Sequence, residues 1–158
     1  MVKQELYREL NLQIRALCEG EPSLIANLAN ISAVLYERLD DTNWAGFYLM
    51  AESIDKQSEE LVLGPFQGKA ACVRIPVGRG VCGTAVSAKE SQLITDVHAF
   101  AGHIACDAAS NSEVVVPIIV AGNVVAVLDI DSPSLARFDQ DDLAGLQKIG
   151  KFVESIWT

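Results

Sequence analysis

The chain has 158 residues, half of them hydrophobic, with 12 basic and 21 acidic side chains and a formal net charge of −9. These values predict one folded domain over residues 1–158 with a substantial core. The negative charge argues against a nucleic-acid surface, because binding phosphates requires clustered lysine and arginine. No apolar run is long enough to cross a bilayer, and the N-terminus lacks the apolar segment of a signal peptide. We therefore expect no membrane association and a cytoplasmic location.

Two helices are expected within residues 2–40. Apolar side chains recur there at spacings of three and four residues, first at Leu6, Leu10, Ile14 and Leu17 and then at Leu24, Leu28, Ile31, Leu35 and Leu39. Ser23 follows a Gly-Glu-Pro break and is suited to cap the second helix. Cys18 ends the first helix, where we interpret it as a small packing residue.

From Trp44 onward the hydrophobic pattern becomes that of strands. The pattern predicts strands over 44–50, 61–66 and 72–76, a glycine-rich turn with a short helix over 78–88, and a brief extended segment over 92–97. The clearest element is a hairpin, in which two apolar strands over 113–120 and 124–130 flank the tight turn Ala-Gly-Asn. All of these lie in a segment, 43–132, that should hold the sheet and its loops.

A last helix is expected over 139–157, with Asp139 as its N-cap. The order of elements is two helices, a run of strands with one helical insertion, and a closing helix. Strands grouped apart from helices favour an α+β fold. We therefore predict a central, mostly antiparallel sheet of about six strands flanked by helices, with the helices on one face.

Three cysteines, Cys72, Cys82 and Cys106, lie in the part of the chain richest in glycine and turns. Thiols on loops contribute little to a core, whereas nearby positive charge or backbone N–H groups favour the reactive thiolate. In a cytoplasmic protein such thiols are more often catalytic, redox-sensing or metal-bound than structural. The sequence therefore predicts a redox site built from these three residues.

The glycine-rich segment and the histidines each raise an alternative. Gly78 and Gly80 precede a helix, but the segment matches neither a dinucleotide fingerprint nor a phosphate-binding P-loop. A turn that aims Cys82 is the favoured interpretation. His98 and His103 lie near Cys106, and Cys82 could join them. Their spacing does not match common zinc sites, so we predict no bound metal, while a transition-metal site stays open as an alternative.

Three carboxylates should meet at one end of the hairpin. Asp129 and Asp131 are two apart in a strand and so point to one face, and Glu113 begins the strand paired with theirs. Solvated strand ends are the plain interpretation. Clustered acids with raised pKa values could instead donate protons or hold an ammonium group. Trp44 and Tyr48 also share a strand face, as core residues or as an aromatic wall for a small ligand.

Six blocks of sequence carry a resemblance: NWAGFY at 43–48, LGPFQG at 63–68, ACVRIPVGRGVCGTA at 71–85, DVH at 96–98, GHIACDAASNSE at 102–113 and VLDIDS at 127–132. Together these blocks closely resemble the free methionine-(R)-sulfoxide reductases, which are enzymes with the GAF fold. The resemblance runs from about residue 43 to 138, with three cysteines in register. It implies an antiparallel sheet backed by helices and the reduction of free L-methionine (R)-sulfoxide.

The same resemblance implies a role for each candidate residue. Cys106 stands at the position of the nucleophile, and its sulfenic acid would condense with Cys72 or, as second choice, with Cys82. Thioredoxin would then reduce the disulfide, without any bound cofactor. The implied substrate contacts are these: Glu113 and Asp131 at the sulfoxide oxygen, Asp129 at the ammonium, and Trp44 with Tyr48 behind it over the S-methyl group.

A homodimer is also expected from the fold. Three other functions compete with the reductase: a GAF sensor that binds a small ligand without chemistry, a thiol switch acting on a partner protein, and a zinc-binding interaction module. GAF sensors normally regulate an attached output domain, for which this chain has no room. A thiol switch would need the cysteines but not the three carboxylates.

Overall fold

The computed structural model describes residues 1–102 and 109–158. Its elements, in chain order, are α1 (Lys3–Cys18), α2 (Leu24–Arg38), β1 (Trp44–Glu52), β2 (Glu59–Gly68), β3 (Arg74–Pro76), α3 (Gly80–Ala88), β4 (Gln92–Ile94), the 3-10 helix η1 (Val97–Ala99), β5 (Ser112–Val120), β6 (Asn123–Ser132) and α4 (Gln140–Ile156). The strands form one sheet in the order β3-β2-β1-β6-β5-β4. Each neighbouring pair is antiparallel, which confirms the predicted α+β fold.

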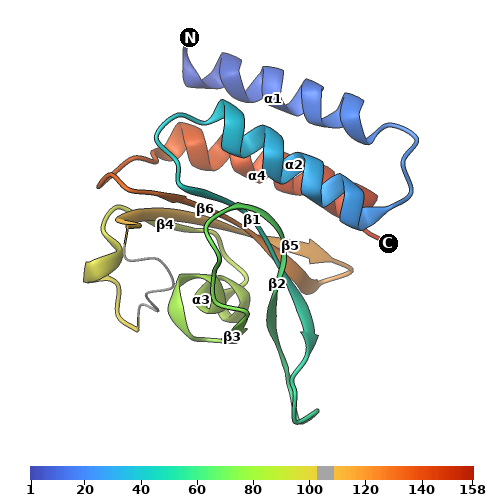
Figure 1. Ribbon diagram of the computed structural model, residues 1–158, viewed down its shortest axis with the longest axis vertical. Helices are drawn as coiled ribbons and strands as arrows, with labels where there is room; N and C mark the ends of the chain where they lie inside the picture. The colour runs from blue at the N-terminus through green and yellow to red at the C-terminus, as the bar shows by residue number, and fades with distance from the viewer. Residues whose placement is uncertain (103–108) are drawn as a thin grey trace.

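The helices lie on both faces of this sheet (Figure 1). Helices α2 and α4 pack against one face, and α1 packs on the outer side of these two. Helix α3 packs on the opposite face, beside β5 and β6. The prediction that the helices lie on one face was therefore wrong, because α3 covers part of the second face.

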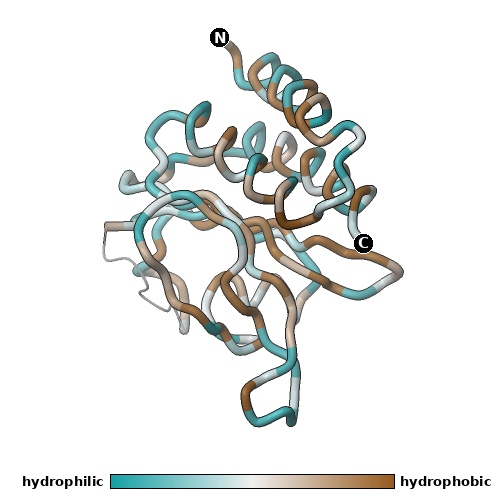
Figure 2. The backbone as a smooth tube through the Cα atoms, turned by 45° about the vertical axis from the view of Figure 1, so that its right-hand side comes forward, coloured by the Kyte–Doolittle hydropathy of each residue, from teal (hydrophilic) through white to brown (hydrophobic). Residues whose placement is uncertain are grey.

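Two buried hydrophobic clusters follow from this arrangement, because alternate strand side chains point to opposite faces. The larger cluster joins Leu10, Leu28, Phe47, Leu128 and Leu146 between the helices and the sheet, with 17 further buried residues from the same elements and the loops beside them. The smaller cluster lies under α3. It comprises Trp44, Tyr48, Leu61, Ile75, Val81, Cys82, Ala85, Val86, Val115 and Val127. Figure 2 shows the hydrophobic residues running along the central strands between these layers.

The predicted helix caps are confirmed. The Ser23 hydroxyl accepts a hydrogen bond from the Ala26 N–H at the start of α2. Asp139 caps α4 and forms a reciprocal capping box with Asp142. Such caps supply partners to N–H groups that the first helical turn leaves unsatisfied.

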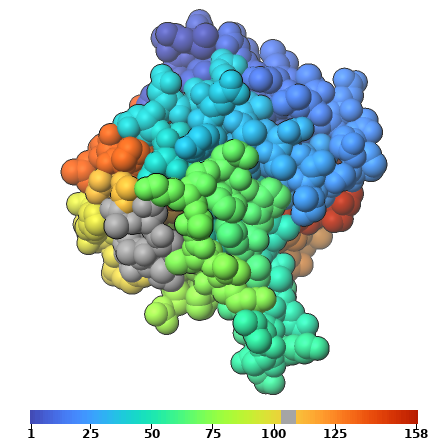
Figure 3. All heavy atoms as spheres, viewed as in Figure 1, coloured from blue at the N-terminus to red at the C-terminus, as the bar shows by residue number. Residues whose placement is uncertain are grey.

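Strand ends differ from the predictions. The β1–β2 hairpin is longer than expected, with only residues 53–58 between its strands, and its tip projects from the body at the bottom of Figure 3. The predicted strand over 72–76 was wrong at its start, because β3 begins at Arg74 and Cys72 lies in the preceding loop. The extended segment over 92–97 ends at Ile94, since Asp96 caps the 3-10 turn that follows.

No helix within residues 1–102 and 109–158 combines the length and the apolarity needed to span a membrane.

A buried ionic cluster fixes α1 against α4. The carboxylate of Asp142 is 1% exposed; it accepts a hydrogen bond from the Tyr7 hydroxyl at 2.8 Å and pairs with Lys3 at 2.6 Å and Arg137 at 3.4 Å. We expect Asp142→Asn to lower the free energy of unfolding by about 1.5–3 kcal/mol, since it removes charge-assisted hydrogen bonds. Denaturant unfolding measures this loss. The neighbouring exposed Asp141→Asn should change stability by no more than about 0.5–1 kcal/mol; equal losses in both variants would contradict the assignment.

Candidate active site

The three predicted carboxylates meet on the sheet face that α3 covers. In the β5–β6 ladder Glu113 lies opposite Asp131 and Val115 lies opposite Asp129, as the hairpin pattern predicted. The turn residues Ala121 and Gly122 both have positive φ, the geometry of a two-residue hairpin loop. A register shift between Ile118 and Ile119 then brings Glu113 opposite Asp131. Glu113 is 8% exposed and Asp129 5% exposed. The plain interpretation as solvated strand ends is therefore wrong for Glu113 and Asp129.

Helix α3 brings Cys82 to the same place. The residue lies in the first turn of the helix, as predicted, and is 4% exposed. Its Sγ is 4.0 Å from Oε2 of Glu113, at the outer limit of an S–H···O hydrogen bond. Gly83 lets the turn before α3 close tightly, because a Cβ there would stand 2.4 Å from the carbonyl oxygen of Pro76. The glycine-rich turn thus aims Cys82 at the carboxylates.

Burial and mutual repulsion control ionisation in this cluster. Burial raises the pKa of Glu113 well above its usual value, and the negative charges of Asp129 and Asp131 raise it further. Burial likewise raises the pKa of the Cys82 thiol, again with a contribution from the carboxylates. Glu113 is therefore suited to hold a proton where an exposed glutamate would have lost it, and Cys82 is held as a thiol. Such a carboxyl can act as a proton donor.

Aromatic rings line the β1 side of the carboxylates. Trp44 stacks on Tyr48 with ring centroids 5.8 Å apart, and Phe66 stacks on the Trp44 ring at 5.1 Å. Trp44 lies directly opposite Asp131 in the β1–β6 ladder, and Gly46 lies opposite Asp129. Phe66 was given no role in the sequence analysis, although it stands in a block of the resemblance. The pairing of β1 with β2 is what points to Phe66. It lies opposite Gly46, and a Cβ at that glycine would stand 2.3 Å from the Phe66 Cβ.

Polar groups of Trp44 and Tyr48 hold the loop that carries Cys72. The Trp44 indole N–H donates to the carbonyl of Lys69 at 3.2 Å, and the Tyr48 hydroxyl donates to the carbonyl of Cys72 at 2.8 Å. The Val73 carbonyl accepts from the Leu63 N–H. Strands β1 and β2 thus fix the backbone of this loop at three points. The sequence offers no pattern that predicts these contacts, because loop carbonyls have no residue preference to detect.

The four cysteines are in different states. Cys72 is disulfide-bonded, whereas Cys18 and Cys82 are free thiols. Cys18 is buried in the larger hydrophobic cluster, as its packing role requires. The predictions for Cys106 and His103 lie outside the described residues.

Among the described residues, the atoms that could bind a metal ion together are not those of the histidine site considered in the sequence analysis. Cys82, Glu113 and Asp129 each place a ligand atom within 4.8 Å of the other two. His98 is not a member of this group; its Nε2 lies 3.0 Å from Oδ1 of Asn111. The histidine of the DVH block therefore contributes to loop structure in the described region.

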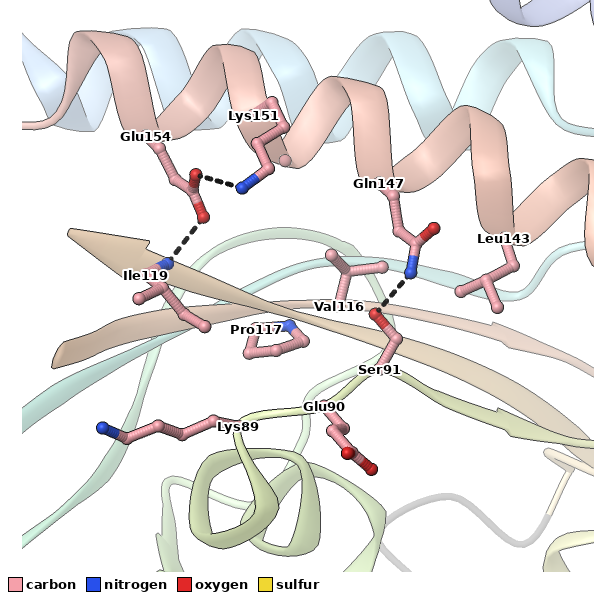
Figure 4. Close-up of a pocket in the computed structure, with 11 residues that line it drawn as sticks. Lys89, Glu90, Ser91, Val116, Pro117, Ile119, Leu143, Gln147, Lys151 and Glu154 are labelled. Atoms are coloured by element: carbon pink, nitrogen blue, oxygen red, sulfur yellow. Dashed lines mark hydrogen bonds and ion pairs between the residues drawn. The ribbon is translucent and has the colours of Figure 1, made fainter. Parts of the chain in front are cut away.

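A concavity lies between α4 and the edge of β5 beyond the short β4 (Figure 4). Its volume is about 620 Å³. Several of its polar groups are paired: Gln147 donates to Ser91, and Glu154 pairs with Lys151 and accepts from the Ile119 N–H at 2.8 Å. Glu154 therefore covers a sheet edge that would otherwise present a free N–H. This groove has the features of edge protection rather than of a reaction site.

Comparison with known proteins agrees with this geometry. A family model described as GAF domain matches residues 26–156. The free methionine-R-sulfoxide reductase of Escherichia coli is 56% identical over 156 residues, covering 99% of this chain and 91% of that protein. The chain belongs to the free methionine-(R)-sulfoxide reductase family of GAF domains.

Two solved structures extend the likeness of this GAF domain to the fold as a whole. The fRMsr of Staphylococcus aureus in complex with substrate has 49% sequence identity and a TM-score of 0.88, covering 96% of this chain and 95% of that one. Free methionine-R-sulfoxide reductase from Neisseria meningitidis, in complex with its substrate, has 46% identity and a TM-score of 0.91, covering 99% and 90%. The family identified from the six sequence blocks is confirmed.

The raised pKa of Glu113 makes the stability of this GAF domain pH-dependent. In the unfolded chain a glutamate loses its proton near pH ~4.3. Above that pH the folded state binds more protons than the unfolded state, so stability falls as pH rises toward the raised folded pKa. We expect Glu113→Gln to remove this loss, which can reach about 1.4 kcal/mol per pH unit for one proton. Urea unfolding of the reduced protein at a series of pH values measures it.

The matched control for that series is Glu37→Gln, an exposed glutamate on α2. Its stability difference from the wild type should not vary over the same pH window. A Glu113→Gln difference that is also constant with pH would show that Glu113 is ionised normally in the folded protein.

Proposed function

We propose that this protein reduces free L-methionine (R)-sulfoxide to L-methionine. One observation carries the proposal: Glu113 and Asp129 are buried with Cys82 on one sheet face, beside stacked aromatic rings. Burying several acids together is costly unless a ligand uses them. A zwitterionic amino acid with a polar sulfoxide supplies both an ammonium group for a carboxylate and an oxygen for a proton donor. The relatives named above bear the name of this activity.

Selectivity for the free amino acid follows from the proposed role of Asp129. Its carboxylate would pair with the substrate ammonium, while Trp44, with Tyr48 behind it, covers the S-methyl group. A peptide-bound or N-acylated sulfoxide lacks the ammonium and leaves the buried charge without a partner. A mismatch of this kind can lower kcat/KM by about 10⁴-fold.

Proton donation is assigned to Glu113, together with Asp131. The raised pKa of Glu113 favours its protonated form, which can donate a proton to the sulfoxide oxygen. Asp131 lies opposite Glu113 in the ladder and is placed to act on the same oxygen. Protonation of that oxygen makes the sulfur more electrophilic, which favours attack by a thiolate.

The thiol chemistry takes place in two steps. The Cys106 thiolate attacks the sulfoxide sulfur, the oxygen passes to Cys106 as a sulfenic acid, and methionine is released. A second thiol then condenses with the sulfenic acid, forming a disulfide and expelling the oxygen as water. Two observations favour Cys72 over Cys82 as that thiol. Cys72 is able to form a disulfide in this fold, and the raised pKa of Cys82 disfavours its thiolate.

The recycling step is proposed by resemblance. Thioredoxin would reduce the disulfide by thiol exchange, so the enzyme needs no bound cofactor of its own. A homodimeric assembly and a cytoplasmic location belong to the same proposal. In the cytoplasm, reducing conditions would return both cysteines to the thiol state.

Turnover coupled to thioredoxin, thioredoxin reductase and NADPH tests the activity. We expect NADPH consumption with the free (R) sulfoxide, none with the (S) epimer, and kcat/KM lower by about 10⁴-fold with the N-acetylated (R) form. Cys106→Ser should abolish turnover, and Cys18→Ala should leave it unchanged because Cys18 lies in the opposite core. No turnover by the folded, fully reduced wild type would overturn the proposal and leave a ligand sensor or a thiol switch.

Asp129→Asn separates the reductase from a bare thiol switch. The variant keeps the shape of the side chain and loses the charge proposed to hold the ammonium. Turnover should fall sharply, while disulfide formation driven by hydrogen peroxide should continue at the wild-type rate. Retained turnover would assign the ammonium to another group.

The hydrogen bond from Tyr48 to the Cys72 loop predicts a step-specific defect. Tyr48→Phe keeps the ring but removes a bond worth about 0.5–1.5 kcal/mol. We expect disulfide formation to slow by about two- to tenfold, and to slow more than methionine release does. Single-turnover quenching with thiol alkylation and mass spectrometry resolves the two steps. Tyr36→Phe, on an exposed tyrosine of α2, is the control; equal slowing of both steps would indicate a general loss of structure instead.

A further inference from the structure

We infer that the buried group of Cys82, Glu113 and Asp129, here called the thiol–carboxylate cluster, binds a divalent transition-metal ion such as Zn²⁺. The inferred consequence is that the bound ion excludes substrate, so that zinc inhibits the enzyme. The binding itself is independent of the proposed reductase activity. Only the inhibition rests on that proposed function.

The donor atoms come from three different elements and are already close together. Cys82 extends from the first turn of α3, Glu113 from β5 and Asp129 from β6, and their ligand atoms all lie within 4.8 Å of one another. A tetrahedral zinc ion has bonds of about 2.3 Å to sulfur and about 2.0–2.2 Å to oxygen, which separates its ligand atoms by roughly 3.5 Å. Small rotations of side chains on regular elements are therefore enough to close the site.

An independent observation points to a cation at this position. Asp129 is 5% exposed, and its Oδ1 is buried without a hydrogen-bond partner. Buried carboxylate oxygens are normally satisfied, and one that is not costs the desolvation of a charged acceptor. Among the described residues, none of the ion pairs includes Asp129 or Glu113. A cation bound by the cluster would supply what this oxygen lacks.

The chemical nature of the donors selects the ion. A thiolate is a soft ligand that favours Zn²⁺ and related transition metals over Mg²⁺ and Ca²⁺, which prefer sets of oxygen ligands alone. With the two carboxylates, the ion has three protein ligands, and water can occupy the fourth position, as in catalytic zinc sites. Magnesium should therefore not compete, whereas cobalt, which accepts similar ligands, should bind as a spectroscopic substitute.

Inhibition follows from the overlap with the substrate. The carboxylate of Asp129 is proposed to pair with the substrate ammonium, and the same oxygens would hold the ion. One occupant excludes the other, so zinc should raise the apparent KM for the free sulfoxide and leave kcat unchanged. Zinc released from damaged thiol sites would then restrain the enzyme until it is removed.

The binding experiment uses the full-length protein, reduced and freed of reductant, and Zn²⁺ itself as the probe. Competition with a chromophoric zinc chelator should give one ion per chain. Loss of an outer-shell partner already weakens metal sites by about 10–100-fold. We therefore expect Cys82→Ser, Glu113→Gln and Asp129→Asn each to weaken binding by at least about tenfold. Excess Mg²⁺ should not displace the zinc.

Controls separate this site from the other thiols. Cys18→Ala, Cys72→Ser and Cys106→Ser should each retain the ion, and the Co²⁺ form should show a thiolate charge-transfer band that only Cys82→Ser removes. Circular dichroism confirms the fold of each variant; Asp129→Asn removes a buried charge and should fold even if another variant does not. Zinc lost with Cys72→Ser or Cys106→Ser but retained by Asp129→Asn and Cys82→Ser would overturn the inference, as would the absence of binding.

The inhibition experiment is separate. Steady-state assays at several zinc concentrations should show an increase in KM at constant kcat. Zinc binding in a protein without turnover would overturn the proposed function but not the metal site. Turnover that zinc at saturating concentration does not affect would overturn the inhibition.

Discussion

Acidic side chains brought together out of contact with water are the constraint on which the rest of this structure depends. If both were ionised, Glu113 and Asp129 would repel each other and lose hydration, which would cost several kcal/mol in the absence of a compensating charge. The fold tolerates it because the site is built on β5 and β6 inside the sheet, and the opposite face of that sheet is covered by α2 over β1 and β2 and by α4 over β5. The larger hydrophobic cluster thus supports the opposite face of the sheet, which carries the smaller cluster and the buried acids.

The hairpin and the caps show what the sequence can predict. Two apolar runs around the Ala-Gly-Asn turn, aligned about Gly122, predict the pairing of Glu113 with Asp131, and the structure reaches this pairing through a register shift between Ile118 and Ile119. Ser23 and Asp139 were predictable for a similar reason, because a cap needs a short polar side chain at one position. Local geometry restricts the choice of residue in each case.

Tertiary contacts decided the elements that were predicted less well. The residues at 72–76 have strand character, yet β3 begins only at Arg74, because the preceding loop is held by side chains of β1 and a single backbone hydrogen bond from β2 rather than by a strand ladder. The burial of the acids was likewise invisible in the pattern, since solvated and buried strand ends have the same spacing. Only the placement of α3 over this face distinguishes them.

The same buried carboxyl groups explain how the sheet face under α3 could both select a ligand and assist its reaction. A buried carboxylate attracts a cation most strongly where water cannot screen it, and the same burial raises the pKa of its neighbour Glu113. In the proposed function, binding an ammonium group at Asp129 would remove part of the repulsion that raises this pKa. The protonated carboxyl would then become a stronger acid once the ligand is in place. Recognition of charge and donation of a proton would thereby be coupled through one electrostatic interaction.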